Sequence, residues 1–191
     1  ALTFFELAAK KKIKKIAFCS SGGTVYGLQQ GSLSEEVSTR PFSPHGIIKV
    51  CLENFLEYNR IKHGISYDIY RIANPYGPRQ ETFKKGLGVI STWLYEILRG
   101  EKVTIFGDGE NIRDYIFIED AVHLLALSSG ADLFQSEIYN IGTNSGTSLN
   151  ELVQMIQEIV PEKVKIHYKE QRQSDNHIAV LDASKILEKY S

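Results

Sequence analysis

The 191-residue sequence predicts an α/β fold built around a parallel sheet. Short apolar runs of strand length alternate along the chain with amphipathic segments of helix length, and this alternation is typical of parallel pairing. Polar, glycine-containing loops follow several of the apolar runs, where parallel sheets place their ligand sites. Hydrophobic residues make up 42% of the chain, which is enough to form a buried core and excludes a disordered protein.

The first part of the chain predicts two helices and two strands. The helices are 1–11 and 44–63, and the strands are 16–19 and 65–72. Ser43 can cap a helix whose first residue is Pro44, and Gly64 suits its left-handed end. Residues 16–19 are all apolar, so we expect both faces of that strand, Cys19 included, to be buried.

The remaining elements are shorter and follow the same alternation. Helices are predicted over 87–99, 120–129, 148–160 and after Asp182, and strands over 102–106, 115–118, 138–141 and 163–168. Ser148 and Glu151 have the spacing of a capping box. Asp120 and Asp182 are predicted to cap the helices that follow them. Residues 20–27 and 74–78 are predicted loops at strand ends.

Composition and charge exclude several classes of protein. Lys and Arg number 22 against 23 Asp and Glu, so no basic excess indicates nucleic acid as the main partner. No apolar run approaches the roughly 18 residues that cross a bilayer. Cys19 and Cys51 cannot form a disulfide framework, and we expect both to be small buried hydrophobic residues in a reducing cytoplasm. The histidines lack zinc-like spacing, so no metal site is predicted.

Two local patterns could carry chemistry, each with an ordinary alternative. The loop over 20–27 could present hydroxyls and bare backbone to a ligand, or be a turn of small residues. His45 and Lys49 lie four residues apart and share a helix face, as a functional pair or a solvated one.

Arg113 and Arg172 suit a diphosphate, although a single Arg is more often a surface residue. No glycine-rich dinucleotide fingerprint occurs.

A series of short motifs runs along nearly the whole chain. They are Ser20-Ser21 through Val25-Tyr26-Gly27, Pro44-x-Gly46-x-x-Lys49, Arg71-x-x-Asn74-Pro75-Tyr76-Gly77-Pro78-Arg79, Ile105-Phe106-Gly107-Asp108-Gly109, Arg113-Asp114-Tyr115, Tyr139-Asn140-Ile141-Gly142 and Asp182-Ala183-Ser184-Lys185. In order and spacing this series resembles the extended short-chain dehydrogenase/reductase family, in particular its NAD-dependent nucleotide-sugar epimerases of the UDP-glucose 4-epimerase type.

The resemblance implies the C-terminal part of a Rossmann-type NAD domain over residues 1–80 and mainly a nucleotide-sugar domain over 81–191, and it allows elements of the two ranges to interleave. It implies that the strand–turn–helix holding the NAD pyrophosphate would precede Ala1, so the chain resembles an N-terminally truncated member. NAD is the cofactor expected from the resemblance, and a UDP-linked sugar is the expected substrate. A cytoplasmic location and a homodimer of the full-length protein are expected as well.

The resemblance also assigns catalytic roles. In the family a Tyr removes the proton from the sugar 4-hydroxyl, a Lys four residues later holds the nicotinamide ribose, and a Ser or Thr bridges Tyr and substrate. Lys49 matches the Lys, whereas His45 occupies the Tyr position and Gly22 the bridging position. Ser21 or Thr24 could supply the hydroxyl, and a neutral imidazole could act as the base.

Other positions match cofactor-binding and substrate-binding residues of the family. By this match Ser20, Lys49, Ala73 and Pro75 lie beside the cofactor, and the substrate contacts are Asn74, Gly88, Val89, Phe106, Arg113, Tyr115, Arg172, Asp175 and Ala179. Asn74, Arg113 and Arg172 match residues that hold the diphosphate. Phe106 matches one that lines the uracil, and Ala179 matches the gate for the hexose 2-substituent.

Two other functions stay open at this point. One is a nucleotide-sugar-binding or partner-binding protein on the same fold, with its active site eroded at Gly22 and His45. The other is a reductase or decarboxylase of the same family. Dehydration is disfavoured, because Gly23-Thr24 stands where the related 4,6-dehydratases carry an Asp-Glu pair.

Overall fold

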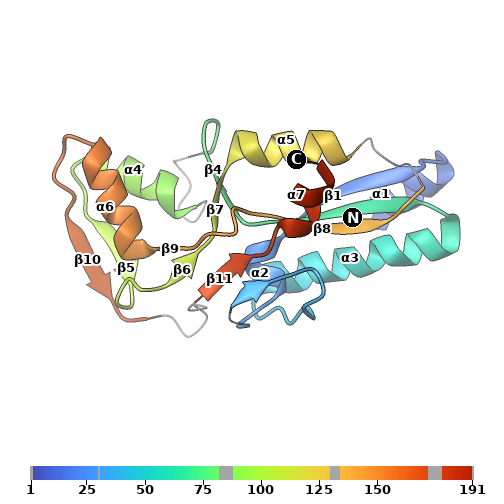
Figure 1. Cartoon of the computed structure of the whole chain (residues 1–191), viewed down its shortest axis with the longest axis horizontal. Helices are drawn as coiled ribbons and strands as arrows, with labels where there is room; N and C mark the ends of the chain where they lie inside the picture. Colours follow the sequence, from blue (N-terminus) through green and yellow to red (C-terminus); the bar gives the residue numbers. More distant parts are fainter. Residues whose placement is uncertain (1, 30, 82–87, 130–133, 172–177, 191) are drawn as a thin grey trace.

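A three-stranded parallel sheet organises one end of the molecule in the computed structural model (Figure 1), which describes residues 2–29, 31–81, 88–129, 134–171 and 178–190. The strand order is β1 (Lys15–Ser21), β3 (Ser66–Ile72) and β8 (Glu137–Ile141). Lys15 is opposite Ser66, and Asp68 is opposite Glu137. This arrangement confirms the α/β fold with parallel strands.

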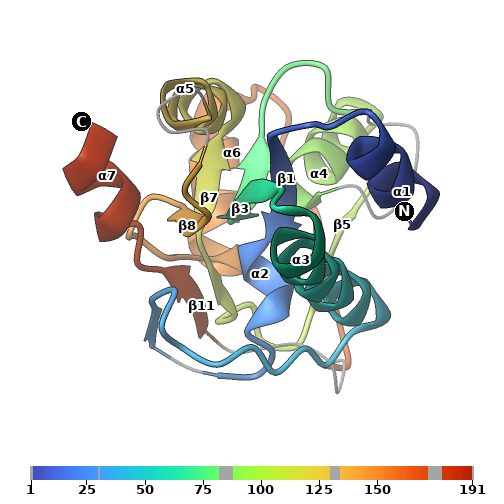
Figure 2. The ribbon, with the colours of Figure 1, turned by 90° about the vertical axis from the view of Figure 1, so that its right-hand side faces the viewer.

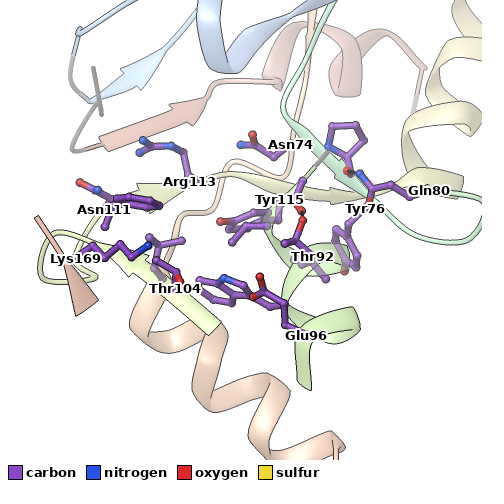
Figure 3. A pocket seen from close by; sticks show the side chains of 17 residues that line it. Asn74, Tyr76, Gln80, Thr92, Glu96, Thr104, Asn111, Arg113, Tyr115 and Lys169 are labelled. Carbon is purple, nitrogen blue, oxygen red and sulfur yellow. Dashed lines mark hydrogen bonds between the residues drawn. The ribbon is translucent and has the colours of Figure 1, made fainter. Parts of the chain in front are cut away.

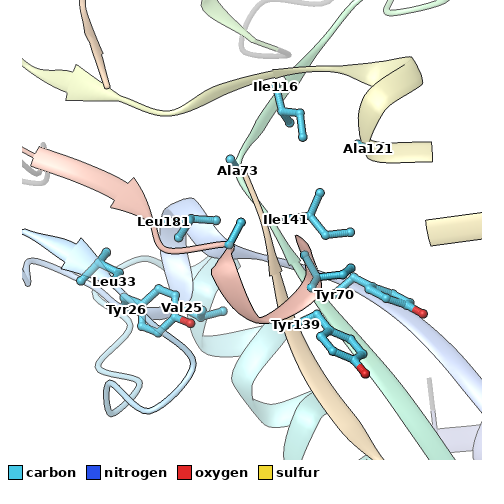
Figure 4. Close-up of a cluster of buried hydrophobic side chains, with 12 residues drawn as sticks. Val25, Tyr26, Leu33, Tyr70, Ala73, Ile116, Ala121, Tyr139, Ile141 and Leu181 are labelled. Carbon is cyan, nitrogen blue, oxygen red and sulfur yellow. The ribbon is translucent and has the colours of Figure 1, made fainter. Parts of the chain in front are cut away.

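Helices cover both faces of this sheet (Figure 2). The helices α1 (Leu2–Lys10) and α3 (Pro44–His63) pack on one face, where Phe5, Leu56 and Ile69 share a core. The helices α5 (Ile118–Ser128) and α7 (Ser184–Tyr190) pack on the other, in a second core that the close-up in Figure 4 shows. Because adjacent residues of β3 point to opposite faces, Ile69 belongs to the first core and Tyr70 to the second.

A second lobe is built by residues from the middle and later parts of the chain. Here α4 (Val89–Leu98) and α6 (Leu149–Ile159) pack with the parallel pair β5 (Val103–Phe106) and β10 (Ile166–Lys169). Its core is Trp93, Ile97, Val103, Ile105, Leu152, Val153 and Ile156. The buried residues of this core and the apolar side chains packed against it all come from positions 89 to 164, so this lobe has a core of its own.

Short strands join the two lobes. A four-stranded sheet has the order β2 (Ser32–Leu33), β11 (Ile178–Leu181), β6 (Ile112–Arg113) and β9 (Thr147–Ser148). A separate parallel pair joins β4 (Asn74–Tyr76) and β7 (Tyr115–Phe117). Residues 74–78 and 20–27 are loops by sequence pattern. The structure instead places β4 in the first segment and a one-turn helix, α2 (Gly22–Val25), in the second.

The ends of α3 and α6 follow the local signals in the sequence. Ser43 accepts a hydrogen bond from the Gly46 amide at 3.1 Å, and Gly64 closes α3 at φ 65°, both as predicted. Ser148 and Glu151 form the predicted capping box of α6. These signals depend on neighbouring residues alone, which is why the sequence was sufficient for them.

The other predicted boundaries hold in part. Asp182 accepts a hydrogen bond from the Ser184 amide at 3.0 Å where α7 begins. Asp120 does not cap α5, because that helix already begins at Ile118 and Asp120 lies inside its first turn. The predicted strand over 163–168 is displaced and forms over Ile166–Lys169.

The expectation that both cysteines are buried is wrong, because Cys19 and Cys51 are both exposed. Burial alternates along β1: Ile16 packs into the core beneath α1 and α3, whereas Ala17 and Cys19 lie exposed on the opposite face. In the described part of the chain β1 pairs only with β3, so it is an edge strand, and the face that carries Ala17 and Cys19 is not covered by a helix there. Cys51 lies on the outward face of α3.

The two predicted ranges, 1–80 and 81–191, exchange elements. From the second range, β8 joins the first sheet, and α5 and α7 complete the core that contains Val25 and Tyr70. None of the helices among the described residues combines the length and the apolar character that crossing a bilayer requires.

Candidate active site

A cavity of about 550 Å³ opens where β4, β5, β6 and α4 meet. Apart from Ala179, it is lined by every predicted substrate residue that lies in the described ranges: Asn74, Gly88, Val89, Phe106, Arg113 and Tyr115. Figure 3 shows Asn74 and Arg113 on one side of the cavity and Thr92 and Glu96 of α4 on the other. Asn74 and Tyr115 lie far apart in the sequence, yet they are direct register partners in β4 and β7.

Hydrogen bonds to backbone carbonyls and a left-handed glycine shape the parts of the cavity around Asn74 and Gly88. The Asn74 side-chain amide donates to the carbonyl oxygen of Asp114 at 2.9 Å, which fixes its orientation beside the cavity. Gly88 precedes α4 at φ 104°, a conformation that side-chain-bearing residues rarely adopt. Thr92 donates its hydroxyl to the Gly88 carbonyl at 2.7 Å. Gly88, Val89 and Ile90 line the cavity, so the N-terminus of α4 opens onto it.

Several lining residues were not predicted from the sequence. They are Tyr76, Gln80, Ile90, Thr92, Trp93, Glu96, Thr104, Asn111, Leu149 and Lys169. Part of the set could have been predicted, because Val89, Thr92, Trp93 and Glu96 have the i, i+3, i+4, i+7 spacing of one helix face. Lys169 had no such signal. Its ammonium group lies 5.9 Å from the centre of the Phe106 ring only because β10 pairs with β5.

The predicted catalytic pair lies on the first turns of α3. His45 is exposed, and Lys49 is half-buried one turn later. The Lys49 ammonium group donates to the Cys19 carbonyl at 2.7 Å, at the carboxyl end of β1. Gly46 lets this helix approach α2 closely, because a Cβ there would lie 2.5 Å from the Thr24 carbonyl oxygen. The helix carrying His45 is thus packed directly against Thr24 of α2.

Gly22 has no room for a side chain in the present packing. A Cβ built there overlaps Leu181 Cδ1 and lies 3.0 Å from the Arg71 carbonyl oxygen. Leu181 is fully buried and belongs to the core in Figure 4. Its methyl group therefore fills the space that a serine or threonine side chain at this position would take. A Cβ on the neighbouring Gly23 would lie 3.6 Å from Asn74 Oδ1, so α2 lies beside the cavity wall.

The comparisons with known proteins agree with this geometry. The model of the NAD dependent epimerase/dehydratase family matches residues 1–142. The chain belongs to this family. A Methanocaldococcus jannaschii protein that carries a provisional UDP-glucose 4-epimerase name is 36% identical over 188 residues, which cover 96% of this chain and 59% of the relative.

Solved structures of the family have the same fold. The Thermotoga maritima UDP-glucose 4-epimerase, crystallised with UDP-glucose, matches with a TM-score of 0.91 and 36% identity over 98% of this chain and 60% of its own. The Thermus thermophilus UDP-glucose 4-epimerase in complex with NAD matches with a TM-score of 0.89 and 28% identity over 98% and 61%. The chain thus spans about 60% of the length of these family members.

A buried polar network lies directly behind the predicted catalytic residues. Arg71 Nη2 pairs with Glu53 Oε2 at 2.8 Å, and Arg71 Nη1 donates to the Tyr26 hydroxyl at 3.1 Å. Ser20 donates its hydroxyl to Glu53, and Tyr26 donates to Asn140 Oδ1 at 2.7 Å. Burial raises the pKa of Tyr26, against the opposing effect of Arg71 and Asn140. The Ser20 side chain therefore faces this network rather than the exposed surface.

The remaining predicted residues lie at the edges of the site or beyond the described ranges. Ala179 is buried on β11, paired in register with Arg113. Ala73 is buried as well, and Pro75 lies at the cavity. Arg172 and Asp175 lie outside the described residues. Within the described ranges no group of three or more potential metal ligands comes together.

Proposed function

We propose that the complete protein epimerises a nucleotide sugar, a UDP-hexose or UDP-N-acetylhexosamine, at C4 through transient oxidation to a keto sugar. The observation that carries this proposal is the convergence of Asn74, Phe106, Arg113 and Tyr115 on one cavity beside α2. These residues come from β4, β5, β6 and β7, and the cavity volume lies in the range of small-molecule sites.

The cavity residues suit the parts of a nucleoside diphosphate. Phe106 offers an aromatic face for a uracil. Arg113 and the Asn74 amide offer donors for diphosphate oxygens, with the positive end of the α4 dipole nearby. Arg172 and Asp175 stay predicted contacts of the same substrate.

NAD supplies the hydride chemistry of this reaction when bound. The residues fit its nicotinamide end, because Lys49 holds an ammonium group at the carboxyl end of β1, where the fold places dinucleotides. Its contact with the nicotinamide ribose needs only charge and reach. Ala73, Pro75 and the Ser20 backbone are proposed neighbours on the same side. The homodimer and the cytoplasmic location stay predictions.

Proton transfer is the step at which this chain departs from its family. His45 is the proposed base, with Ser21 or Thr24 as the bridging hydroxyl. A neutral imidazole can accept a proton near pH 7. The alternative is an eroded, non-catalytic nucleotide-sugar-binding protein, and the filled space above Gly22 favours it.

Incubation of the complete gene product with UDP-glucose or UDP-N-acetylglucosamine and NAD, with products separated by chromatography, tests the proposal. Formation of the C4 epimer supports it. Binding of the UDP-sugar without turnover favours the non-catalytic alternative, and failure to bind any UDP-sugar contradicts both.

The 191-residue chain by itself is expected to bind NAD weakly. Its sequence holds no glycine-rich turn leading into a helix N-terminus, the feature that normally neutralises the pyrophosphate. Titration calorimetry on this chain, with the complete gene product as the control, measures the difference. A micromolar dissociation constant for the 191-residue chain would show the expectation to be wrong.

The sugar pocket is expected to accept an N-acetyl group, because Ala179 is small where the family carries its gate for the 2-substituent. Ala179→Tyr should therefore weaken UDP-N-acetylglucosamine binding by about 10-fold or more while UDP-glucose binding is retained. Competitive titration of the two sugars on the complete protein measures this. Improved binding of the acetamido sugar to the variant would contradict the assignment of Ala179.

A further inference from the structure

Asp114 is a buried carboxylate at the junction between the two lobes. It is 1% exposed and lies between β6 and β7. Its Oδ1 accepts from the Thr143 amide at 3.0 Å and from the Thr143 hydroxyl at 2.7 Å. Its Oδ2 accepts from the Leu181 amide at 3.3 Å. Burial raises the pKa of Asp114, and these hydrogen bonds act in the opposite direction.

The backbone of Asp114 is engaged as well. Its amide donates to the Ala179 carbonyl at 3.1 Å. Its carbonyl oxygen accepts from both the backbone amide and the side-chain amide of Asn74, at 3.0 and 2.9 Å. A Cβ at Gly142 would overlap Asp114 Oδ2, so a glycine permits this close approach. One residue thus joins β4, β11 and the end of β8.

From these contacts we infer that Asp114 is a positioning residue for the substrate diphosphate: it holds Asn74 and the adjacent Arg113 in fixed relation at the cavity. The inference rests on the proposed function. The Asn74 side-chain amide is oriented by the Asp114 carbonyl, and Arg113 directly precedes Asp114 in the chain. A shift of the Asp114 backbone therefore moves both groups together.

A carboxylate is needed at this position rather than an amide of the same shape. The Thr143 amide lies 3.0 Å from Oδ1 and 3.2 Å from Oδ2, and the Leu181 amide approaches Oδ2. In Asp114→Asn either orientation of the side-chain amide turns an NH₂ group toward one of these backbone donors. The backbone amide that faces this NH₂ group is then buried without an acceptor, which is unfavourable, and the chain shifts locally to relieve it.

The test compares Asp114→Asn with Asp120→Asn, the same change at an exposed carboxylate in the first turn of α5. UDP and NAD are titrated separately into the complete gene product. Asp114→Asn should weaken UDP binding by about 10-fold, with NAD binding unchanged, and Asp120→Asn should change neither. Thr143→Ser keeps the hydroxyl donor and should behave as the unmodified protein, whereas Thr143→Val should weaken UDP binding selectively.

The outcomes separate the positioning role from the proposed function. If the unmodified protein does not bind UDP, the proposed function fails. If it binds UDP and Asp114→Asn binds equally well, the positioning role is wrong. A parallel loss of UDP and NAD binding would indicate general disruption and would also overturn it. Where Asp114→Asn does not fold, Thr143→Val decides: an unchanged UDP affinity of that variant overturns the inference.

Discussion

Replacing His45 by tyrosine in the complete protein is expected to raise the turnover of a UDP-hexose by about 100-fold or more. General-base contributions of roughly 10²–10⁴ in rate are typical, and a base that does not reach the proton forfeits most of them. An imidazole extends about 2 Å less from the backbone than a phenol does, and misplacement on that scale is costly for proton transfer. His45 lies in the first turn of α3, whose backbone packs tightly against Thr24, so the helix does not move to make up the difference.

Steady-state rates with one UDP-sugar and NAD measure this effect, and His123→Tyr is the matched control. His123 is an exposed histidine on α5, so its replacement should leave turnover unchanged. If the unmodified protein already turns over as fast as His45→Tyr, the imidazole is the working base and the active site is not eroded.

The same series tests the bridging position. Gly22→Ser alone should help little, because the proton it relays still has to reach the shorter His45 side chain. The structure adds a steric reason, since the new side chain meets Leu181 Cδ1 and the Arg71 carbonyl. Pairing Gly22→Ser with Leu181→Ala removes the overlap with Leu181 and leaves the closer approach to the Arg71 carbonyl. Combining both changes with His45→Tyr should raise turnover by more than the separate effects predict.

The sequence was sufficient where the signal is local. The cap at Ser43, the left-handed Gly64 and the capping box at Ser148 depend on neighbouring residues only, and the structure shows all three. Strands of two or three residues such as β2, β6 and β9 have no periodicity to detect and form only through their partners. The burial of Cys19 was predicted wrongly because an apolar run does not reveal whether both faces of its strand are covered.

The candidate site shows the same difference between features visible in the sequence and contacts that form only on folding. The motif residues that line the cavity were assigned by resemblance, since their chemistry is visible in the chain. Leu181 and Gly22 lie near opposite ends of the sequence, and the contact that fills the space beside Gly22, the predicted bridging position, exists only in the folded protein. Glu53 lies four residues after Lys49, on the same helix face, yet its buried role depends on β3 presenting Arg71 opposite it.

Glu53→Ala is expected to destabilise the fold by about 3–5 kcal/mol, because it leaves the Arg71 guanidinium buried without its carboxylate partner. The two side chains are 6% and 7% exposed, so water does not replace the lost carboxylate, and the Ser20 hydroxyl loses its acceptor at the same time. Replacing both members of the buried pair, as Glu53→Leu with Arg71→Met, should recover much of the loss, since no buried charge then remains unpaired.

Urea unfolding of the complete protein measures these losses, with Glu57→Ala as the control. Glu57 pairs with Arg60 at 2.7 Å, but these side chains are 40% and 46% exposed, so removal of the pair should cost about 1 kcal/mol or less. The contrast arises because water solvates a charge left unpaired at the surface and does not reach one left unpaired between α3 and β3. If Glu53→Ala and Glu57→Ala lower the free energy of unfolding equally, the buried pair does not hold α3, and with it Lys49, against the sheet.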